Sequence, residues 1–277
     1  MNSIPNISLS LASFLPLSRM AELEKSLRAS YSNAKPFPYV ILDNFFDSSL
    51  IDLVLSEFPK PGEIKWQHFN TQQEIKLASD SELAFGPATR LFLYHLNSST
   101  FLQFLSKITG ITNLIPDPWF DGGGLHQIVR GGKLGIHVDF NKHPRYGLDR
   151  RLNLLLYLNK DWREEYGGHL ELWDRDMARC DAKILPIFNR LVIFGTTDFT
   201  FHGHPDPLKC PDGMTRKSLA LYYFSNGRPA DEISHEHSTL FRARNEQELK
   251  LPFKQRLGQI TKDFLPPIVT RLLRRYL

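Results

Sequence analysis

Apolar residues in the first 110 positions recur at a helical spacing, and polar residues fill the positions between them. This pattern predicts three helices, over residues 21–30, 49–58 and 87–110. Ser48 is a plausible N-cap for the second helix, and Gly110 is a natural stop for the third. Residues 39–42 form a short β-type run, whereas residues 63–80 are polar and only weakly patterned.

From residue 111 onward the pattern changes to short apolar runs separated by turns. The predicted strands are 125–129, 134–140, 152–158, 168–173, 190–194, 200–202 and 218–224. Strands at this spacing are typical of an all-β sandwich or barrel, and helices that precede them are expected to flank it. The sequence therefore predicts a mainly β fold, a double-sheet barrel of the jelly-roll type with N-terminal helices.

The 277 residues are interpreted as one large domain with appendages. Residues 1–30 form an N-terminal arm and a helix, and residues 31–226 form the domain, with its motifs in 115–226. Residues 227–277 form a C-terminal extension. Two helical segments are expected within that extension, over 246–264 and 268–277.

Composition narrows the possible partners and the compartment. Hydrophobic residues make up 42% and charged residues 23% of the chain, and the net charge of +4 is too small to favour nucleic acid. No apolar run reaches the ~20 residues of a membrane span, and the N-terminus lacks the basic start of a secretory signal. Two distant cysteines, Cys180 and Cys210, are expected to be free and reduced, which favours the cytoplasm.

The sequence Gly131–Phe140, GGKLGIHVDF, contains the first candidate for chemistry. His137 and Asp139 are two residues apart, so in a strand their side chains point to the same face. One more histidine would complete two histidines and a carboxylate on one side of a metal, the facial triad of non-haem Fe(II) oxygenases. The alternative is a hydrogen-bonded strand histidine with a nearby turn aspartate.

Two histidines compete for the third position. His202 follows the apolar strand 190–194 and a turn, and His204 is two residues further on. We favour His202 because a glycine follows it, which lets the chain turn away from the metal. His235 and His237 have the same spacing, but they are expected to be solvated loop residues because their stretch is polar.

A candidate anion site lies on the last predicted strand. Arg216 and Ser218 share one face there. The guanidinium matches a carboxylate, and the hydroxyl adds a donor. An arginine facing a barrel interior needs an anion, which is either a structural Asp or Glu or the carboxylate of a bound molecule.

These pieces occur in the order found in a known enzyme family. Residues 115–226 resemble the 2-oxoglutarate and Fe(II)-dependent oxygenases of the prolyl 4-hydroxylase-like type. The resemblance rests on His137-x-Asp139, Tyr157-Leu158-Asn159-Lys160-Asp161-Trp162, Gly167-Gly168-x-Leu170, Arg190-Leu191-Val192-x-Phe194, His202 and Arg216-x-Ser218.

The resemblance implies a double-stranded β-helix of the cupin-like kind. It implies Fe²⁺ held by His137, Asp139 and His202, and 2-oxoglutarate as cosubstrate with its far carboxylate on Arg216 and Ser218. Tyr157 and Gln127 stand where relatives contact the cosubstrate, and the alternative for Tyr157 is an ordinary core aromatic. L-ascorbate is a candidate cofactor.

The reaction implied is a dioxygenase reaction in which O2 and 2-oxoglutarate hydroxylate an unactivated C–H bond and yield succinate and CO2. The substrate is a protein residue or a small metabolite, and residues 63–86, 141–151 and 203–215 are expected to form its entrance. Two alternatives remain: a zinc or manganese hydrolase, which would need a general base and no arginine, and a non-catalytic binding barrel.

Overall fold

The computed structural model of the chain describes residues 11–245 and 248. The residues divide into two compact units, Met1–Arg242 and Ala243–Leu277, and the description below concerns the first. The helices expected over 246–264 and 268–277 lie outside the described residues, apart from Glu248. The division of the chain into an arm, a domain and an extension stays a prediction.

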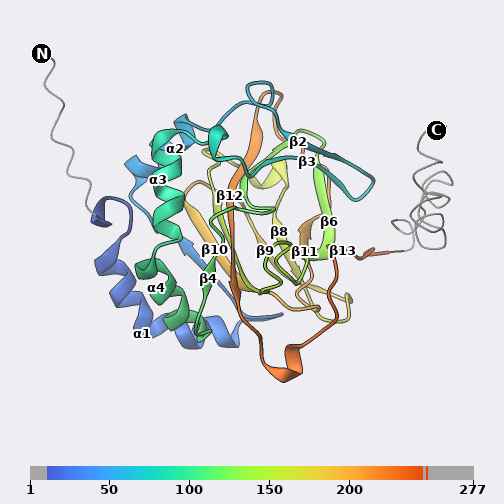
Figure 1. The fold of residues 1–277 in the computed structure, drawn as a ribbon. Helices are drawn as coiled ribbons and strands as arrows, with labels where there is room; N and C mark the ends of the chain where they lie inside the picture. The colour runs from blue at the N-terminus through green and yellow to red at the C-terminus, as the bar shows by residue number, and fades with distance from the viewer. Residues whose placement is uncertain (1–10, 246–247, 249–277) are drawn as a thin grey trace, which may run out of the picture. The chain divides into compact units, whose positions relative to one another are not determined.

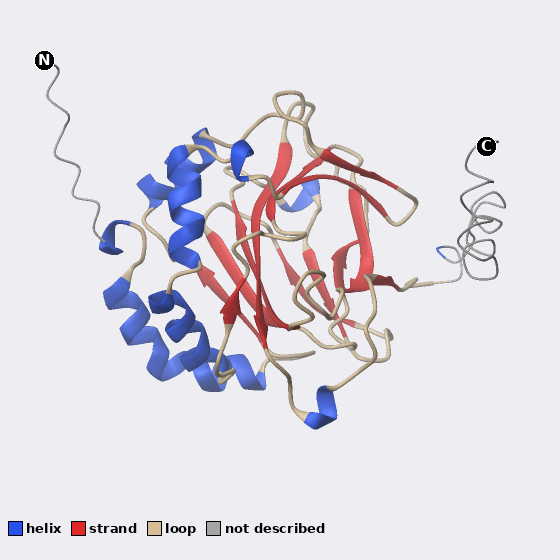
Figure 2. Ribbon diagram, in the orientation of Figure 1, coloured by secondary structure: helices blue, strands red, loops and turns tan. Residues whose placement is uncertain are grey.

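The described α-helices all lie before residue 110, with β1, β2 and β3 between them, and Figure 2 shows these α-helices gathered on one side of the sheet. The four α-helices are α1 (Leu17–Asn33), α2 (Ser48–Ser56), α3 (Pro87–Leu96) and α4 (Ser99–Thr109). Short 3-10 turns are η1 (Leu11–Ser13), η2 (Glu82–Ala84), η3 (Glu164–Tyr166) and η4 (Ala230–Glu232). The predicted helices are confirmed in place, although α1 begins four residues earlier than expected.

Capping side chains decide where these helices begin and end. Asp47, and not Ser48, caps α2, because its carboxylate accepts from the backbone N–H groups of Ser49 and Leu50. The single helix expected over 87–110 is two helices, since Ser98 caps a new start at α4. Gly110 ends α4 in the left-handed conformation, as predicted.

Within residues 11–245, thirteen strands form one curled antiparallel sheet (Figure 1). They are β1 (Tyr39–Asp43), β2 (Gln67–Asn70), β3 (Glu74–Ser79), β4 (Ile115–Pro116), β5 (Gly124–Val129), β6 (Lys133–Val138), β7 (Asp149–Tyr157), β8 (Leu170–Trp173), β9 (Cys180–Ile184), β10 (Arg190–Gly195), β11 (His202–His204), β12 (Thr215–Ser225) and β13 (Leu240–Phe241). The main order is β1-β10-β7-β12-β5-β3-β6-β11-β8-β9. The predicted β-rich fold with flanking helices is confirmed.

Four parts of this sheet were not predicted, and the smallest is the two-residue strand β4, which pairs with β12. The hairpin β2–β3 occupies the polar stretch 63–80, and β9 follows a loop with no strand signal. The chain after residue 225 returns to the sheet as β13, which pairs with β6 opposite His137 and Val138. Pairing across the sheet therefore overrides weak local patterning at its edges.

The central strands β7, β10 and β12 separate two apolar layers. Leu154 and Leu156 of β7 and Leu221 of β12 pack with the helices in the larger core. The alternate side chains of these strands face the other side of the sheet, where Tyr157 of β7 and Phe194 of β10 belong to a second apolar cluster. Because both faces of these strands are covered, their sequences are almost continuously apolar. That second face is the interior of the curled sheet.

The part of the chain that the structure describes holds no helix long and apolar enough to cross a membrane.

We expect Phe104→Ala to lower the free energy of unfolding by about 3–5 kcal/mol, because it removes a fully buried ring between α4 and the sheet. Leu53→Ala is the matched control. Leu53 is 50% exposed on α2, so the free energy of unfolding of this variant should lie within about 0.5 kcal/mol of the parent's value. Urea unfolding followed by circular dichroism measures both, and equal losses would contradict the proposed core.

A second prediction concerns His126 of β5, whose cross-strand neighbours are Ser218 and Ala78. Burial and the charge of Lys76 lower the pKa of His126 to about 3. Below its unfolded pKa of about 6.5, the unfolded chain takes up a proton there that the native state does not, so stability falls as the pH falls.

Replacing His126 with Gln removes this pH-dependent contribution to stability. Between about pH 4.5 and 6.5, the unfolding free energy of His126→Gln should rise less steeply with pH than that of the parent, by up to about 1.4 kcal/mol per pH unit. Urea midpoints at several pH values measure the slopes. Parallel slopes would show that His126 protonates equally in both states.

Candidate active site

Three side chains meet on the interior of the sheet. His137 lies near the end of β6, Asp139 follows that strand, and His202 begins β11. Asp139 Oδ1 is 3.5 Å from His137 Nε2, and its Oδ2 is 3.3 Å from His202 Nε2. One ligand atom from each residue lies within 4.8 Å of the others, which is close enough to hold a metal ion.

Strand pairing creates this meeting. His202 pairs with His137 in the β11–β6 ladder, and His204 pairs with Leu134, so β6 carries one extra residue as a bulge. Gly203 sits inside this ladder. A Cβ there would lie 2.6 Å from the carbonyl oxygen of Gly135, so the close approach needs glycine. The glycine thus allows close strand pairing, whereas the sequence had suggested that it turns the chain away.

The hydrogen bonds of the two triad histidines fix their tautomers. Nδ1 of His137 lies 2.9 Å from the Gly135 carbonyl oxygen, and Nδ1 of His202 lies 2.9 Å from that of Thr200. A carbonyl only accepts, so each Nδ1 carries a hydrogen, and Nε2 is the ring nitrogen that can offer a lone pair to a metal beside Asp139. Two imidazole lone pairs and a carboxylate facing one point suit a divalent cation such as Fe²⁺, so the donor set fits.

A buried arginine and an amide hold the carboxylate of Asp139 in place. Asn153 Nδ2 donates to Asp139 Oδ2 at 2.7 Å, and Arg150 Nη2 lies 3.2 Å from the same oxygen. Burial alone would raise the pKa of Asp139, but the charge of Arg150 beside it lowers that pKa well below its ordinary value. The aspartate is therefore a carboxylate.

Arg150 is itself fixed on several sides. Its Nε and Nη2 donate to Asn153 Oδ1, and its guanidinium lies 3.5 Å from the centroid of the Tyr222 ring. A bulge in the β7–β12 ladder places it inward, opposite Phe224. Its link to Asp139 depends on this bulge, so the spacing of residues in the sequence does not reveal it.

Arg216 lies on the same interior face, on β12. Its Nε donates to the Gly168 carbonyl at 2.8 Å, and its Nη2 donates to the Tyr157 hydroxyl at 3.2 Å. Among the described residues, no Asp or Glu forms an ion pair with it. The structural ion pair considered above is thus absent from this part of the chain, and a buried guanidinium faces the interior without a counter-anion.

Two further predicted contacts surround Arg216. Ser218 and Tyr157 are direct cross-strand partners, so both side chains face inward beside it. Burial raises the pKa of the Tyr157 hydroxyl, against the opposing effect of Arg216, and burial lowers the pKa of Arg216. The hydroxyl therefore stays protonated and can donate a hydrogen bond.

The structure does not bring Gln127 to this cluster. Its amide donates to the Pro59 carbonyl at 3.1 Å and accepts from the Thr215 hydroxyl at 2.8 Å. Along β5 the side chains alternate, and the interior position belongs to its neighbour His126, opposite Ser218. The side chain of Gln127 therefore points to the face opposite Arg216 and Ser218, which corrects the expectation that it contacts a cosubstrate.

His204, the rival third ligand, is inside the sheet but away from Asp139. The three-residue metal cluster includes His202 and does not include His204. His204 is 3% exposed, and neither of its ring nitrogens has a hydrogen-bond partner among the described residues. Burial and the charges of Arg216 and Lys76 lower its pKa well below the ordinary value, so the ring is neutral.

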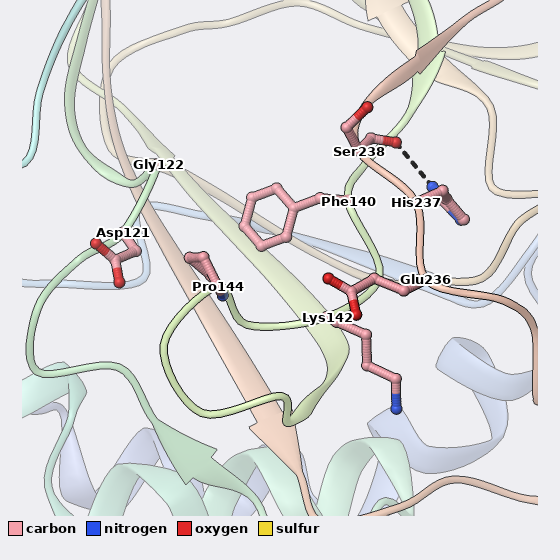
Figure 3. Close-up of a pocket in the computed structure, with 8 residues that line it drawn as sticks. All are labelled: Asp121, Gly122, Phe140, Lys142, Pro144, Glu236, His237 and Ser238. Carbon is pink, nitrogen blue, oxygen red and sulfur yellow. Dashed lines mark hydrogen bonds between the residues drawn. The ribbon is translucent and has the colours of Figure 1, made fainter. Parts of the chain in front are cut away.

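A cavity of about 210 Å³ opens onto the triad. His137, Asp139, Arg150, Phe140 and Tyr222 line it together with residues of β2 and β3. A wider pocket of about 560 Å³ shares Phe140 and Gly122 with it, and Figure 3 shows Phe140 between its two walls.

The walls of these pockets are partly those predicted. Residues of 63–86 line the inner cavity, and residues of 141–151 line the wider pocket. None of the described pockets is lined by 203–215. The segment 236–239 was missed: Glu236, His237 and Ser238 form one wall of the wider pocket. His237 is held there by Asn141 and Asp198, so it is not the solvated residue that its polar sequence suggested.

A second cluster, formed by Asp117, Asp121 and His143, also has metal-like spacing. Here Nδ1 of His143 accepts from the Arg145 backbone N–H, so Nε2 carries the hydrogen and faces Asp117 Oδ1 at 3.3 Å. A metal needs a lone pair at that nitrogen. The cluster is therefore a buried polar support for the loop before β7.

Comparisons with known proteins agree with this geometry. Residues 123–224 match a family model described as the 2OG-Fe(II) oxygenase superfamily. A search of curated proteins found no match.

Solved structures with the same fold include prolyl hydroxylases. One is a Trichoplax adhaerens prolyl hydroxylase in complex with a hypoxia inducible factor peptide fragment; it is 21% identical, with a TM-score of 0.54, over 76% of this chain and 92% of that one. A Pseudomonas putida prolyl-4-hydroxylase is 16% identical, with a TM-score of 0.50, over 75% and 100%. A third is SnoN, a non-heme alpha ketoglutarate dependent epimerase from nogalamycin biosynthesis, which is 13% identical with a TM-score of 0.51 over 81% and 97%.

The double-stranded β-helix expected from the sequence is thus confirmed, and the matched region contains His137, Asp139, Tyr157, His202 and Arg216. Residues 123–224 are thus similar to the 2OG-Fe(II) oxygenase superfamily, and the chain shares its fold with solved prolyl hydroxylases, which supports a 2-oxoglutarate-dependent oxygenase.

Proposed function

We propose that this chain is a dioxygenase that uses Fe²⁺, O2 and 2-oxoglutarate to hydroxylate an unactivated C–H bond, with succinate and CO2 as coproducts. The observation that carries the proposal is a pair of features on one interior face. A metal-competent triad lies beside a buried arginine that has no acidic partner among the described residues. A 2-oxo diacid could bind the metal with its 2-oxo acid end and the arginine with its far carboxylate.

His137, Asp139 and His202 would hold the metal through their Nε2 atoms and carboxylate. Bound iron would supply the oxidising chemistry, driven by the oxidative decarboxylation of the 2-oxo acid. The Nδ1–H bonds to the Gly135 and Thr200 carbonyls orient both rings, so that each Nε2 would face the metal. Arg150 and Asn153 keep Asp139 ionised and aimed at the same point.

Arg216 would bind the far carboxylate of 2-oxoglutarate, with the hydroxyls of Tyr157 and Ser218 as further donors. Its position is fixed in advance, since Gly168 and Tyr157 already take two of its N–H groups. The surrounding strands bury it, so water competes weakly for the bound anion. This accounts for a charged side chain kept in the barrel interior.

The two alternative readings explain less of the site. A metal hydrolase would use the triad but has no use for Arg216, whose burial is costly without an anion. A binding barrel without turnover would not need both bare Nε2 atoms turned toward Asp139. L-ascorbate as a cofactor and the cytoplasmic location remain proposals based on family resemblance and on the two cysteines.

For the substrate we propose a protein residue or a small metabolite. Neighbours with this fold include a hydroxylase bound to a peptide and an epimerase from nogalamycin biosynthesis, so the fold alone does not select between a protein and a small-molecule substrate. The wider pocket carries both an acid and a base on its rim, Glu236 and Lys142, which suits a polar substrate of mixed charge.

The test is an anaerobic titration of the chain with Fe²⁺ and 2-oxoglutarate. We expect a visible charge-transfer absorption, because a 2-oxo acid that chelates iron gives one, and we expect His137→Ala and His202→Ala to lose it with the metal. His68→Ala, on the exposed edge strand β2, is the control. A folded, iron-loaded parent without the absorption would contradict the proposal. Succinate formation across peptides, free amino acids and other metabolites then identifies the substrate.

A further prediction concerns the support of Asp139. Arg150→Leu should weaken Fe²⁺ binding by about 10–100-fold, because the carboxylate loses its buried partner. Arg145→Leu removes a similar pair with Asp121 outside the triad and should leave metal affinity unchanged. Metal affinity is measured by competition with a chelator, and melting temperatures show that both variants fold. Equal affinities would show that Asn153 alone orients Asp139.

A further inference from the structure

His204 is a buried polar side chain whose hydrogen-bonding capacity is unused. It is 3% exposed, and both ring nitrogens lack a partner among the described residues. Leaving a buried donor or acceptor unpaired costs about 1–3 kcal/mol, so an imidazole in this state is retained at a cost that a bound molecule can offset.

The position of His204 indicates where such a molecule would lie. It follows His202 by two residues on β11 and pairs with Leu134, which lines the triad cavity, so its ring is on the interior side. β11 also pairs antiparallel with β8, where Gly203 lies opposite Glu171, so His204 continues along β8 toward Gly168, whose carbonyl accepts from Arg216 Nε. Arg216 and Lys76 are the nearby cations that act on the ring. Lys76 already pairs with Glu74 at 3.2 Å, whereas Arg216 has no acidic partner among the described residues.

His204 can donate a hydrogen bond and Arg216 carries a positive charge, so a negatively charged acceptor between them would satisfy both. A neutral imidazole always carries one N–H, and a carboxylate has two oxygens with several lone pairs. Hydrogen bonds to a charged acceptor are roughly twice as strong as those between neutral groups. His204 thus complements the anion that Arg216 requires, and it does so without adding a second buried charge.

We propose that His204 donates a hydrogen bond to the same carboxylate that Arg216 binds, so that an imidazole and a guanidinium together hold the far end of the 2-oxo diacid. This inference rests on the function proposed above. It makes His204 a binding residue for the cosubstrate and gives it no part in holding the metal. It also predicts that His204 distinguishes 2-oxo diacids from 2-oxo monoacids.

The test compares binding of 2-oxoglutarate and of 2-oxobutyrate, which lacks the far carboxylate, to Fe²⁺-loaded protein without oxygen. In His204→Leu, the affinity for 2-oxoglutarate should fall by about 10–100-fold, and the affinity for 2-oxobutyrate should not change. His204→Gln restores a donor of similar reach and should recover most of the affinity. His68→Leu is the matched control on the exposed strand β2.

Three results would overturn the inference. Loss of Fe²⁺ binding in His204→Leu but not in His202→Ala would make His204 the third ligand. Equal weakening of both 2-oxo acids would assign the effect to packing near the metal. Unchanged binding of both would show that the imidazole does not meet the carboxylate. Failure of the proposed function is separate, because it would appear as a parent protein that binds neither acid.

Discussion

The pairing of β11 with β6 is the constraint on which the site depends. It sets His202 opposite His137, and the two rings lie with centroids 4.5 Å apart. The two strands are 65 residues apart in the chain, so only the curled sheet can join them. Gly203 allows the close approach, and the bulge in β6 keeps both Leu134 and His137 on the interior side. A shift of one residue in this register would turn a ligand away from Asp139.

Two buried arginines show how this interior is balanced electrostatically. Arg150 has an acidic partner in Asp139, and its remaining surface is covered by the rings of Phe140 and Tyr222. Arg216 has a carbonyl and a hydroxyl but no acidic partner among the described residues. Arg150 therefore pairs with a carboxylate of the chain itself, whereas Arg216 needs an anion from a bound molecule. This difference separates a structural arginine from a binding one.

The sequence predicted what depends on spacing within one strand and missed what depends on register between strands. The i, i+2 pairs His137–Asp139 and Arg216–Ser218 follow from alternation alone, and the strand assignments around them hold. Gln127 was misplaced because its neighbour His126 takes the interior position, a fact set by pairing with β12. The hairpin β2–β3 and the wall 236–239 were missed because both are polar and gain their order from distant partners.

Histidine roles in this chain follow from the partner of Nδ1 more than from burial, since His137, His143, His202 and His204 are all buried. A carbonyl at Nδ1 leaves Nε2 bare in His137 and His202, which suits a metal. In His143 a backbone N–H donates to Nδ1, which leaves the hydrogen on Nε2, 3.3 Å from Asp117 Oδ1. His204 has no partner at either nitrogen among the described residues, so its tautomer is free to follow a ligand. Beside Arg216, an anionic ligand would select the His204 tautomer whose N–H points toward the anion.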